Sequence, residues 1–378
     1  MLVLIEFEKR PLLFNDPERI ISCDRLEGVA PCFAQMEEAL KAGRYLAGFL
    51  SYECGYAFEE KLQEDKTYDF PLLCFGVYAR PITPNDSHFA AAAARRFTLN
   101  ITKPAYFDNI STIKSYIEKG DTYQITYCLK FKFDFEGDPY TFYRQLLAEQ
   151  PVPYPAFIET ADHKILSLSP EMFVKKAGDN IKTKPMKGTW PRGKNRWEDL
   201  WAGKKLHFDP KNRAENIMIA DLLRNDLGRL GADIRWPRIF EVARYHTLFQ
   251  MTSTITGKID PQLTLYKLFA SLHPSGSVTG APKIRSMEII RELETEERRI
   301  YTGAIGYIAP NKDLFFNIPI RTLLIRNSVG EMGVGGGIVW DSTPEAEFEE
   351  CLLKARFLTG PASPYPGSCP AGAGYRRP

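Results

Sequence analysis

The sequence has no excess of charge of one sign. Its 378 residues include 49 Lys and Arg against 47 Asp and Glu, a formal net charge of +2. It has no block of five or more Lys or Arg residues that would attract nucleic acid or an anionic membrane surface. No apolar run approaches the roughly 18 residues of a membrane span, and Glu6 and Glu8 interrupt the start before a signal-peptide stretch could form. We therefore expect a cytoplasmic protein with no nucleic-acid or membrane partner.

The usual cysteine and histidine patterns of disulfide frameworks and transition-metal sites are missing too. The seven cysteines are odd in number and never spaced as C-x-x-C, and the five histidines form no H-x-x-x-H pair. We expect reduced thiols that pack as small core residues. Any bound metal should be a hard ion held by carboxylates.

What is present is the pattern of a globular α+β protein. Hydrophobic residues make up 44% of the chain, and several strand-like segments follow one another with only short turns, which favours antiparallel pairing. We predict antiparallel sheets forming a sandwich-like core with helices packed outside. The expected organisation is a small N-terminal lobe over residues 1–100 packed on a catalytic core over 101–360. A Pro/Gly-rich disordered tail is expected over 361–378.

The segment TKPMKGTWPRG, residues 183–193, is predicted to be a loop because prolines and glycines punctuate it. Lys187 lies at its centre. Composition alone favours a solvated lysine there, since most lysines are exposed. The alternative is an amine nucleophile, which requires a pKa lowered by burial or by neighbouring positive charge.

Carboxylates at four positions are candidates for acid–base or metal chemistry. Glu171 ends a strand-like run and follows a proline, where an acid or base could reach into a pocket. Glu215 shares a helix face with apolar residues, and a buried carboxylate needs a partner such as a metal ion. A second helix aligns Glu347, Glu350 and Lys354, although spacing equally fits a solvated Glu350–Lys354 pair. The alternative for Glu171 is a glutamate of a surface turn or of a helix start. Two such helices make a Mg²⁺ site plausible.

Two glycine-rich segments do not match nucleotide-binding motifs. HPSGSVTGAPK lacks the GK[ST] ending of a phosphate loop, but its loop-to-helix transition could hold a carboxylate near Ser277. GVGGGIVWD fails the G-x-G-x-x-G pattern, because Ile338 occupies the last glycine position. We therefore exclude a dinucleotide site.

Taken together, the motifs resemble the chorismate-utilising enzymes. They occur in order over about residues 105–360: GDTYQIT, SLSPE, PMKGT, KNRAENIMIADLLRNDLG, PSGSVTGAPK, YTGAIGY, IRT, GVGGGIV and PEAEFEECLLKA. The resemblance implies that family's fold and a substrate, chorismate. Lysine at position 187 is typical of the branch that aminates chorismate at C4 to 4-amino-4-deoxychorismate, on the route to 4-aminobenzoate and folate. Anthranilate synthases carry alanine there and place a catalytic histidine where this chain has Gln250.

The resemblance also implies a role for each candidate residue. Lys187 would attack C2 and Glu171 would act as acid and base near the C4 oxygen. Glu215 and Glu350, supported by Glu347, would hold Mg²⁺. Residues matching the family's substrate-binding positions are Gly188, Thr189, Ser277, Tyr301, Arg321, Gly335, Gly337 and Lys354.

The resemblance implies a partner as well. The chain has no G-x-C-x-G nucleophile loop with a downstream His–Glu pair, so a separate glutamine amidotransferase subunit is expected to supply ammonia. Two alternatives stay open at this point. One is another reaction of the same family, that of an anthranilate, isochorismate or salicylate synthase. The other is a non-catalytic subunit that binds chorismate without turnover.

Overall fold

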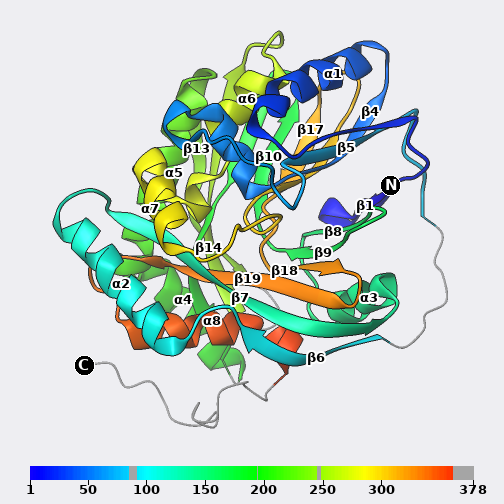
Figure 1. The fold of residues 1–378 in the computed structure, drawn as a ribbon. Helices are drawn as coiled ribbons and strands as arrows, with labels where there is room; N and C mark the ends of the chain where they lie inside the picture. Colours follow the sequence, from blue (N-terminus) through cyan, green and yellow to red (C-terminus); the bar gives the residue numbers. More distant parts are fainter. Residues whose placement is uncertain (85–91, 194, 245–247, 361–378) are drawn as a thin grey trace.

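The fold consists of two antiparallel sheets with helices on their outer faces, as Figure 1 shows. The structure is a computed structural model that describes residues 1–84, 92–193, 195–244 and 248–360. The tail predicted over residues 361–378 lies outside the described residues. The expectation of an α+β fold with antiparallel sheets is confirmed.

The first sheet has nine strands within the described part of the chain. Their order is β15 (Gly280–Ala281), β7 (Gln124–Gly137), β19 (Val329–Ile338), β18 (Thr322–Arg326), β9 (Lys164–Ser169), β8 (Tyr154–Glu159), β1 (Leu2–Ile5) and β2 (Leu12–Phe14), and β6 (Ala92–Leu99) also pairs with β7.

The second sheet has ten strands within the same described ranges. Their order is β12 (Met186–Pro191), β14 (Leu248–Ile259), β11 (Asn180–Lys184), β10 (Met172–Ala177), β17 (Leu314–Asn317), β16 (Ala304–Ile308), β4 (Tyr45–Leu50), β5 (Leu73–Tyr78) and β3 (Arg19–Cys23), and β13 (Gly231–Arg244) also pairs with β14.

Successive buried residues of one strand belong to different hydrophobic clusters of the sandwich. Ile165 of β9 and Leu324 of β18 pack with Phe315 of β17 in one cluster that joins the two sheets. Their sequence neighbours Leu166 and Leu323 belong instead to the cluster beneath the helices. Successive side chains of a strand point to opposite faces, so each strand serves both layers.

Eight helices cover the outer faces in the described part. They are α1 (Val29–Lys41), α2 (Lys103–Glu118), α3 (Pro139–Glu149), α4 (Arg196–Phe208), α5 (Pro210–Gly228), α6 (Leu265–Leu272), α7 (Lys283–Leu293) and α8 (Pro344–Thr359). Helices α1 and α5 pack on strands of the second sheet, and α2 and α8 pack against each other and on β19 of the first. Figure 1 shows α1 and α6 at the top and α2, α8 and α3 at the bottom, with the sheets between them.

Strands from residues 1–100 extend both sheets. β1 pairs with β8 in the first sheet, and β4 pairs with β16 in the second. The predicted boundary between a lobe over 1–100 and a core over 101–360 stays a prediction.

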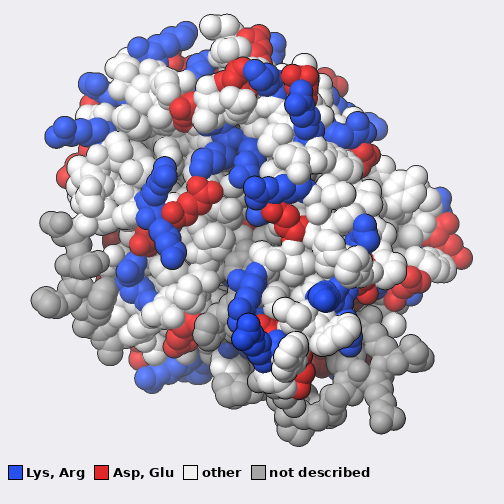
Figure 2. Space-filling model, turned by 180° about the vertical axis from the view of Figure 1, so that it is seen from behind, with Lys and Arg blue, Asp and Glu red and all other residues white. Residues whose placement is uncertain are grey.

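The surface carries both signs of charge. Figure 2 shows Lys and Arg side chains gathered around a hollow on the face opposite to the view of Figure 1, with Asp and Glu side chains among them. Among the described residues, no helix combines the length and the apolar character that crossing a bilayer requires.

Candidate functional site

Lys187 lies on a strand, so the prediction of a loop over residues 183–193 was wrong for its centre. β12 pairs with β14, and the register shifts between Met186 and Thr189. Gly188 sits in this irregularity with a φ of +90°, a conformation that favours glycine. A Cβ atom at position 188 would also come within 2.9 Å of the side-chain oxygen of Asn212 on α5. The bulge therefore needs its glycine and bends the strand at the lysine.

The amine of Lys187 lies against the backbone of the first sheet. A Cβ atom placed on Gly337 of β19 would lie 2.6 Å from Lys187 Nζ and would collide with Nε2 of Gln124. A glycine at 337 is thus required for the lysine of one sheet to reach the backbone of the other. The site is formed where the edge strand β12 meets β7 and β19.

Charged neighbours of both signs surround Lys187. Burial lowers the pKa of Lys187 below its usual range, while the opposite charge of Glu215 raises it and the like charge of Lys354 lowers it again. Glu171 and Glu350 act in the same direction as Glu215. The net effect lowers the pKa of Lys187, which favours the neutral amine that a nucleophile requires. The structure therefore brings together four residues that the sequence separates by up to 179 positions: Lys187, Glu171, Glu215 and Glu350.

Glu171 is a buried carboxyl group between β9 and β10, with 3% of its surface exposed. Its Oε1 accepts hydrogen bonds from Ser277 Oγ at 2.8 Å and from the backbone N–H of Met186 at 3.4 Å. Burial raises the pKa of Glu171 to about 7, although both hydrogen bonds and the charge of Lys187 oppose the shift. A carboxyl with a pKa near neutrality can both donate and accept a proton at physiological pH.

Glu215 lies on α5, and Glu347 and Glu350 lie on α8. Both helices begin with a side-chain cap. Asp209 caps α5 and Thr343 caps α8, each followed by a proline at the first helical position. A Cβ atom on Gly336 would lie 2.8 Å from Glu347 Oε2 and 3.9 Å from Glu350 Oε1, so both carboxylates face β19.

These carboxylates have protein partners. Ser342 Oγ donates to Glu347 at 2.7 Å, and Lys354 Nζ binds Glu350 Oε1 at 2.8 Å. Lys354 also donates to the carbonyl oxygen of Gly335 at 2.7 Å. In this arrangement, no group of three metal-ligating side chains in the described ranges is close enough to hold an ion. Their oxygen donors nevertheless match the chemistry that Mg²⁺ prefers.

The remaining predicted substrate-binding residues differ in their surroundings. Tyr301 is buried and its side chain lies against Gly333 of β19, where a Cβ atom would collide with it. Burial raises the pKa of Tyr301 well above its usual range, which keeps the hydroxyl protonated. Arg321 adopts a φ of +51° just before β18, and such conformations in non-glycine residues often mark functional sites. Thr189 pairs through its backbone with Gln250, and its side chain lies outside the described residues.

Sequence reasoning missed Gln124, which the structure places beside Lys187. Gln124 is fully buried, and within the described part of the chain its amide nitrogen and oxygen have no hydrogen-bond partner. A buried amide without partners is costly, so such a group in a site points to a ligand. The available signal was a polar residue at the start of a long, mostly buried strand. Ser342, which bonds Glu347, was missed as well.

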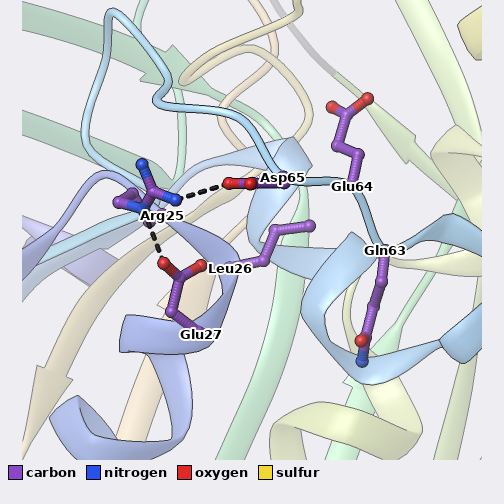
Figure 3. A pocket seen from close by; sticks show the side chains of 6 residues that line it. All are labelled: Arg25, Leu26, Glu27, Gln63, Glu64 and Asp65. Carbon is purple, nitrogen blue, oxygen red and sulfur yellow. Dashed lines mark hydrogen bonds and ion pairs between the residues drawn. The ribbon is translucent and has the colours of Figure 1, made fainter.

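A surface pocket elsewhere shares no residue with this site. Arg25, Leu26, Glu27, Gln63, Glu64 and Asp65 line it, and Figure 3 shows Arg25 bridging Glu27 and Asp65. Exposed ion pairs of this kind contribute little to stability.

Comparison with known proteins identifies several similar sequences. The chain is 39% identical to aminodeoxychorismate synthase component 1 of Escherichia coli (strain K12) over 93% of this chain and 84% of that protein. It is 38% identical to the protein of the same name from Klebsiella aerogenes, over 76% of this chain but only 64% of that protein. It is 34% identical to anthranilate synthase component 1 of Lactococcus lactis over 82% of this chain and 71% of that protein.

Solved structures agree on the fold. Anthranilate synthase component I from Streptococcus pneumoniae aligns with a TM-score of 0.82 at 26% identity, covering 95% of this chain and 92% of that one. A putative isochorismate synthase from Bacillus anthracis shares the fold at 18% identity, with a TM-score of 0.77 over 94% of each chain. Residues 82–360, which include every site residue named above, match the description "chorismate binding enzyme". The chain belongs to the family of chorismate binding enzymes.

Proposed function

We propose that this chain aminates chorismate at C4 to give 4-amino-4-deoxychorismate, an intermediate toward 4-aminobenzoate and folate. The single observation that supports this best is the pairing of a lysine of lowered pKa, Lys187, with a buried carboxyl of raised pKa, Glu171. The relatives named aminodeoxychorismate synthase component 1 add support. The cytoplasmic location expected from the sequence belongs to the same proposal.

The first half of the reaction uses Lys187 as the nucleophile. Its neutral amine attacks C2 of the ring, the ring double bonds shift, and the bond between C4 and its hydroxyl breaks. Glu171 gives its proton to that oxygen, which leaves as water. A carboxyl with a pKa of about 7 is well suited to this transfer.

The second half of the reaction releases Lys187 from the ring. Ammonia attacks C4, the double bonds shift back, and the bond between C2 and Lys187 breaks. Glu171, now ionised, takes up the excess proton from the incoming nitrogen. Two displacements leave the amine at C4 in the orientation of the original hydroxyl.

The other residues would bind and orient the substrate. We assign its carboxylates to Arg321, to Lys354 and to backbone N–H groups beside Gly335 and Gly337, since a guanidinium fork and close-approaching backbone suit carboxylates. Gly188, Thr189, Ser277 and Tyr301 would complete the binding surface. Glu215, Glu350 and Glu347 would hold Mg²⁺, and the bound ion would neutralise the ring carboxylate of chorismate.

We further propose that a separate glutamine amidotransferase subunit supplies the ammonia. The name component 1 in the relatives is consistent with a second component. Free ammonium should replace that subunit in vitro.

The product decides between this reaction and its alternatives. The purified chain is incubated with chorismate, Mg²⁺ and ammonium, and the products are separated by chromatography. We expect 4-amino-4-deoxychorismate. Anthranilate or isochorismate as the only product would show that the chain catalyses a different reaction of the family, and binding without turnover would show a non-catalytic subunit.

A further inference from the structure

Helix α4 exposes an aromatic stripe to solvent. Trp197, Trp201 and Phe208 lie at spacings of four and seven residues, and 74%, 62% and 65% of their surfaces are exposed. Leu200 beside them is 55% exposed. These spacings place the four side chains on one side of the helix. Large exposed aromatic patches are typical of protein–protein interfaces, where Trp is enriched among the residues that contribute most to binding.

The stripe is not needed for packing α4 onto its own chain. The opposite side of the helix carries Ala202 and Leu206, which pack in a small cluster of their own. That cluster also contains Phe240, Phe249 and Met251 from β13 and β14. The helix therefore presents apolar residues on both sides, and the described part of the chain covers only one of them.

The exposed helix is fixed to the catalytic strand. Arg192, five residues after Lys187, forms a two-pronged ion pair with Asp199 of α4, at 2.6 and 2.7 Å. The backbone N–H of Gly193 donates to the same carboxylate at 3.1 Å. At its other end α4 runs into Asp209, the cap of the helix that carries Glu215. A protein bound to α4 would contact the segment that joins two parts of the site.

Basic residues surround the stripe. Arg196, Lys204 and Lys205 of α4 are exposed around it, and Lys204 Nζ lies 5.7 Å from the centre of the Trp201 ring. The exposed acidic residue Glu198 accepts a hydrogen bond from Asn195. The complementary surface is an apolar pocket for indole rings with Asp and Glu at its rim.

We propose that this aromatic stripe of α4 is the docking surface for the ammonia-supplying glutamine amidotransferase subunit. The inference rests on the proposed function, which requires ammonia from outside the chain. In bulk water at neutral pH most ammonia is protonated and is no nucleophile, so the donor subunit should sit close to the amination site. The stripe offers apolar anchors, a charged rim and a rigid connection to β12 and α5.

The test separates docking from chemistry. The variant W197A/W201A is compared with the control I20S/V329S, which removes two exposed apolar side chains at 50% and 57% exposure from β3 and β19. The partner is the purified glutamine amidotransferase subunit that co-sediments with the wild-type chain. We expect W197A/W201A to lose at least tenfold in glutamine-dependent rate and in affinity for that subunit, measured by sedimentation. Its ammonium-dependent rate should stay within twofold of wild type.

A rim variant tests the same surface without removing the aromatics. K204E/K205E should slow association with the subunit and weaken its salt dependence, again at an unchanged ammonium-dependent rate. Wild-type affinity in both variants would overturn the proposal. A wild-type chain that self-associates through α4, with glutamine coupling intact in W197A/W201A, would assign the stripe to a second copy instead.

The proposed function can fail separately. Absence of amination with ammonium in the wild type would refute the chemistry, while sedimentation with the amidotransferase would still report on the stripe. If no amidotransferase gives the wild type glutamine-dependent activity although ammonium does, the docking proposal is wrong and the chemistry stands.

Discussion

Two buried glutamates in different regions share a pKa of about 7 but not the same surroundings. Glu53 lies in the N-terminal part at 2% exposure, and Glu171 lies at the site at 3%. Burial is the main cause in both. Glu53 Oε1 accepts from the backbone N–H of Arg298 at 2.7 Å, and its Oε2 accepts from that of Arg299 at 3.0 Å. Both hydrogen bonds found for Glu171 end on one oxygen, Oε1.

The difference distinguishes a structural carboxyl from a catalytic one. Glu53 uses both oxygens to bind the backbone N–H groups of Arg298 and Arg299. Glu171 keeps its second oxygen for another partner and lies beside the amine of Lys187. A raised pKa alone therefore does not identify a site, whereas a raised pKa with an uncommitted oxygen and a nucleophile nearby does.

The largest expected effect concerns the nucleophile. Lys187→Ala should lower the amination rate by at least about 10³-fold, because the covalent route is lost. The control is Lys184→Ala, since Lys184 lies on the preceding strand and pairs with Glu241 at 3.6 Å. Product chromatography with ammonium measures both. A Lys187→Ala rate near that of the control would remove lysine from the mechanism.

Glu171→Gln should lower kcat by about 10²-fold or more, since the amide cannot transfer the proton. The pH profile of the wild type should fall as pH rises through about 7, where the carboxyl loses the proton it donates. The variant should lose this dependence while its thermal unfolding stays cooperative. A profile that keeps its limb near pH 7 in Glu171→Gln would assign the limb to another group.

Glu53→Gln should affect stability and leave the rate per folded molecule unchanged. The amide offers one acceptor to two backbone N–H groups, and an unsatisfied buried donor costs about 1–3 kcal/mol. Between pH 4.5 and about 7 the folded wild type keeps a proton on Glu53 that the unfolded chain releases, so its free energy of unfolding falls as pH rises through this window. Urea denaturation at pH 5 and pH 8 should show a smaller fall in the variant. A lower kcat in Glu53→Gln would contradict the comparison.

Ser277→Ala should have the smallest effect. The Ser277 hydroxyl stabilises the charged form of Glu171, so its loss should raise the pKa of Glu171 further and move the falling limb of the pH profile upward. Ser277→Thr keeps a hydroxyl and should restore the wild-type profile. An unchanged limb in Ser277→Ala would show that the hydrogen bond does not act on the proton transfer.

Periodicity predicted several helices well. The helix expected around Glu215 is α5 at Pro210–Gly228, and the one expected to align Glu347, Glu350 and Lys354 is α8 at Pro344–Thr359. Here a Pro start or an apolar period gave a clear signal. Helix α4 was missed, because four of its apolar positions face solvent and obscure the period.

Long-range proximity could not be predicted from spacing. The sequence interval of 16 residues between Glu171 and Lys187 does not indicate that their side chains lie close together at a junction of two sheets. The register of the family motifs joined Glu215 to Glu350, and the structure places both near Lys187. Residues 183–193 were predicted as a loop because of their prolines and glycines. A bulge at Gly188 lets these residues form an edge strand instead.

Intact-protein mass spectrometry tests the central claim, that Lys187 attacks the substrate, most directly. The chain is mixed with chorismate and Mg²⁺ without ammonium, then digested to locate any adduct. We expect a covalent adduct on Lys187 with the mass of chorismate less one water, present also in Glu53→Gln and lost when ammonium is added. Normal amination with no adduct under these conditions, or an adduct on another residue, would contradict the account.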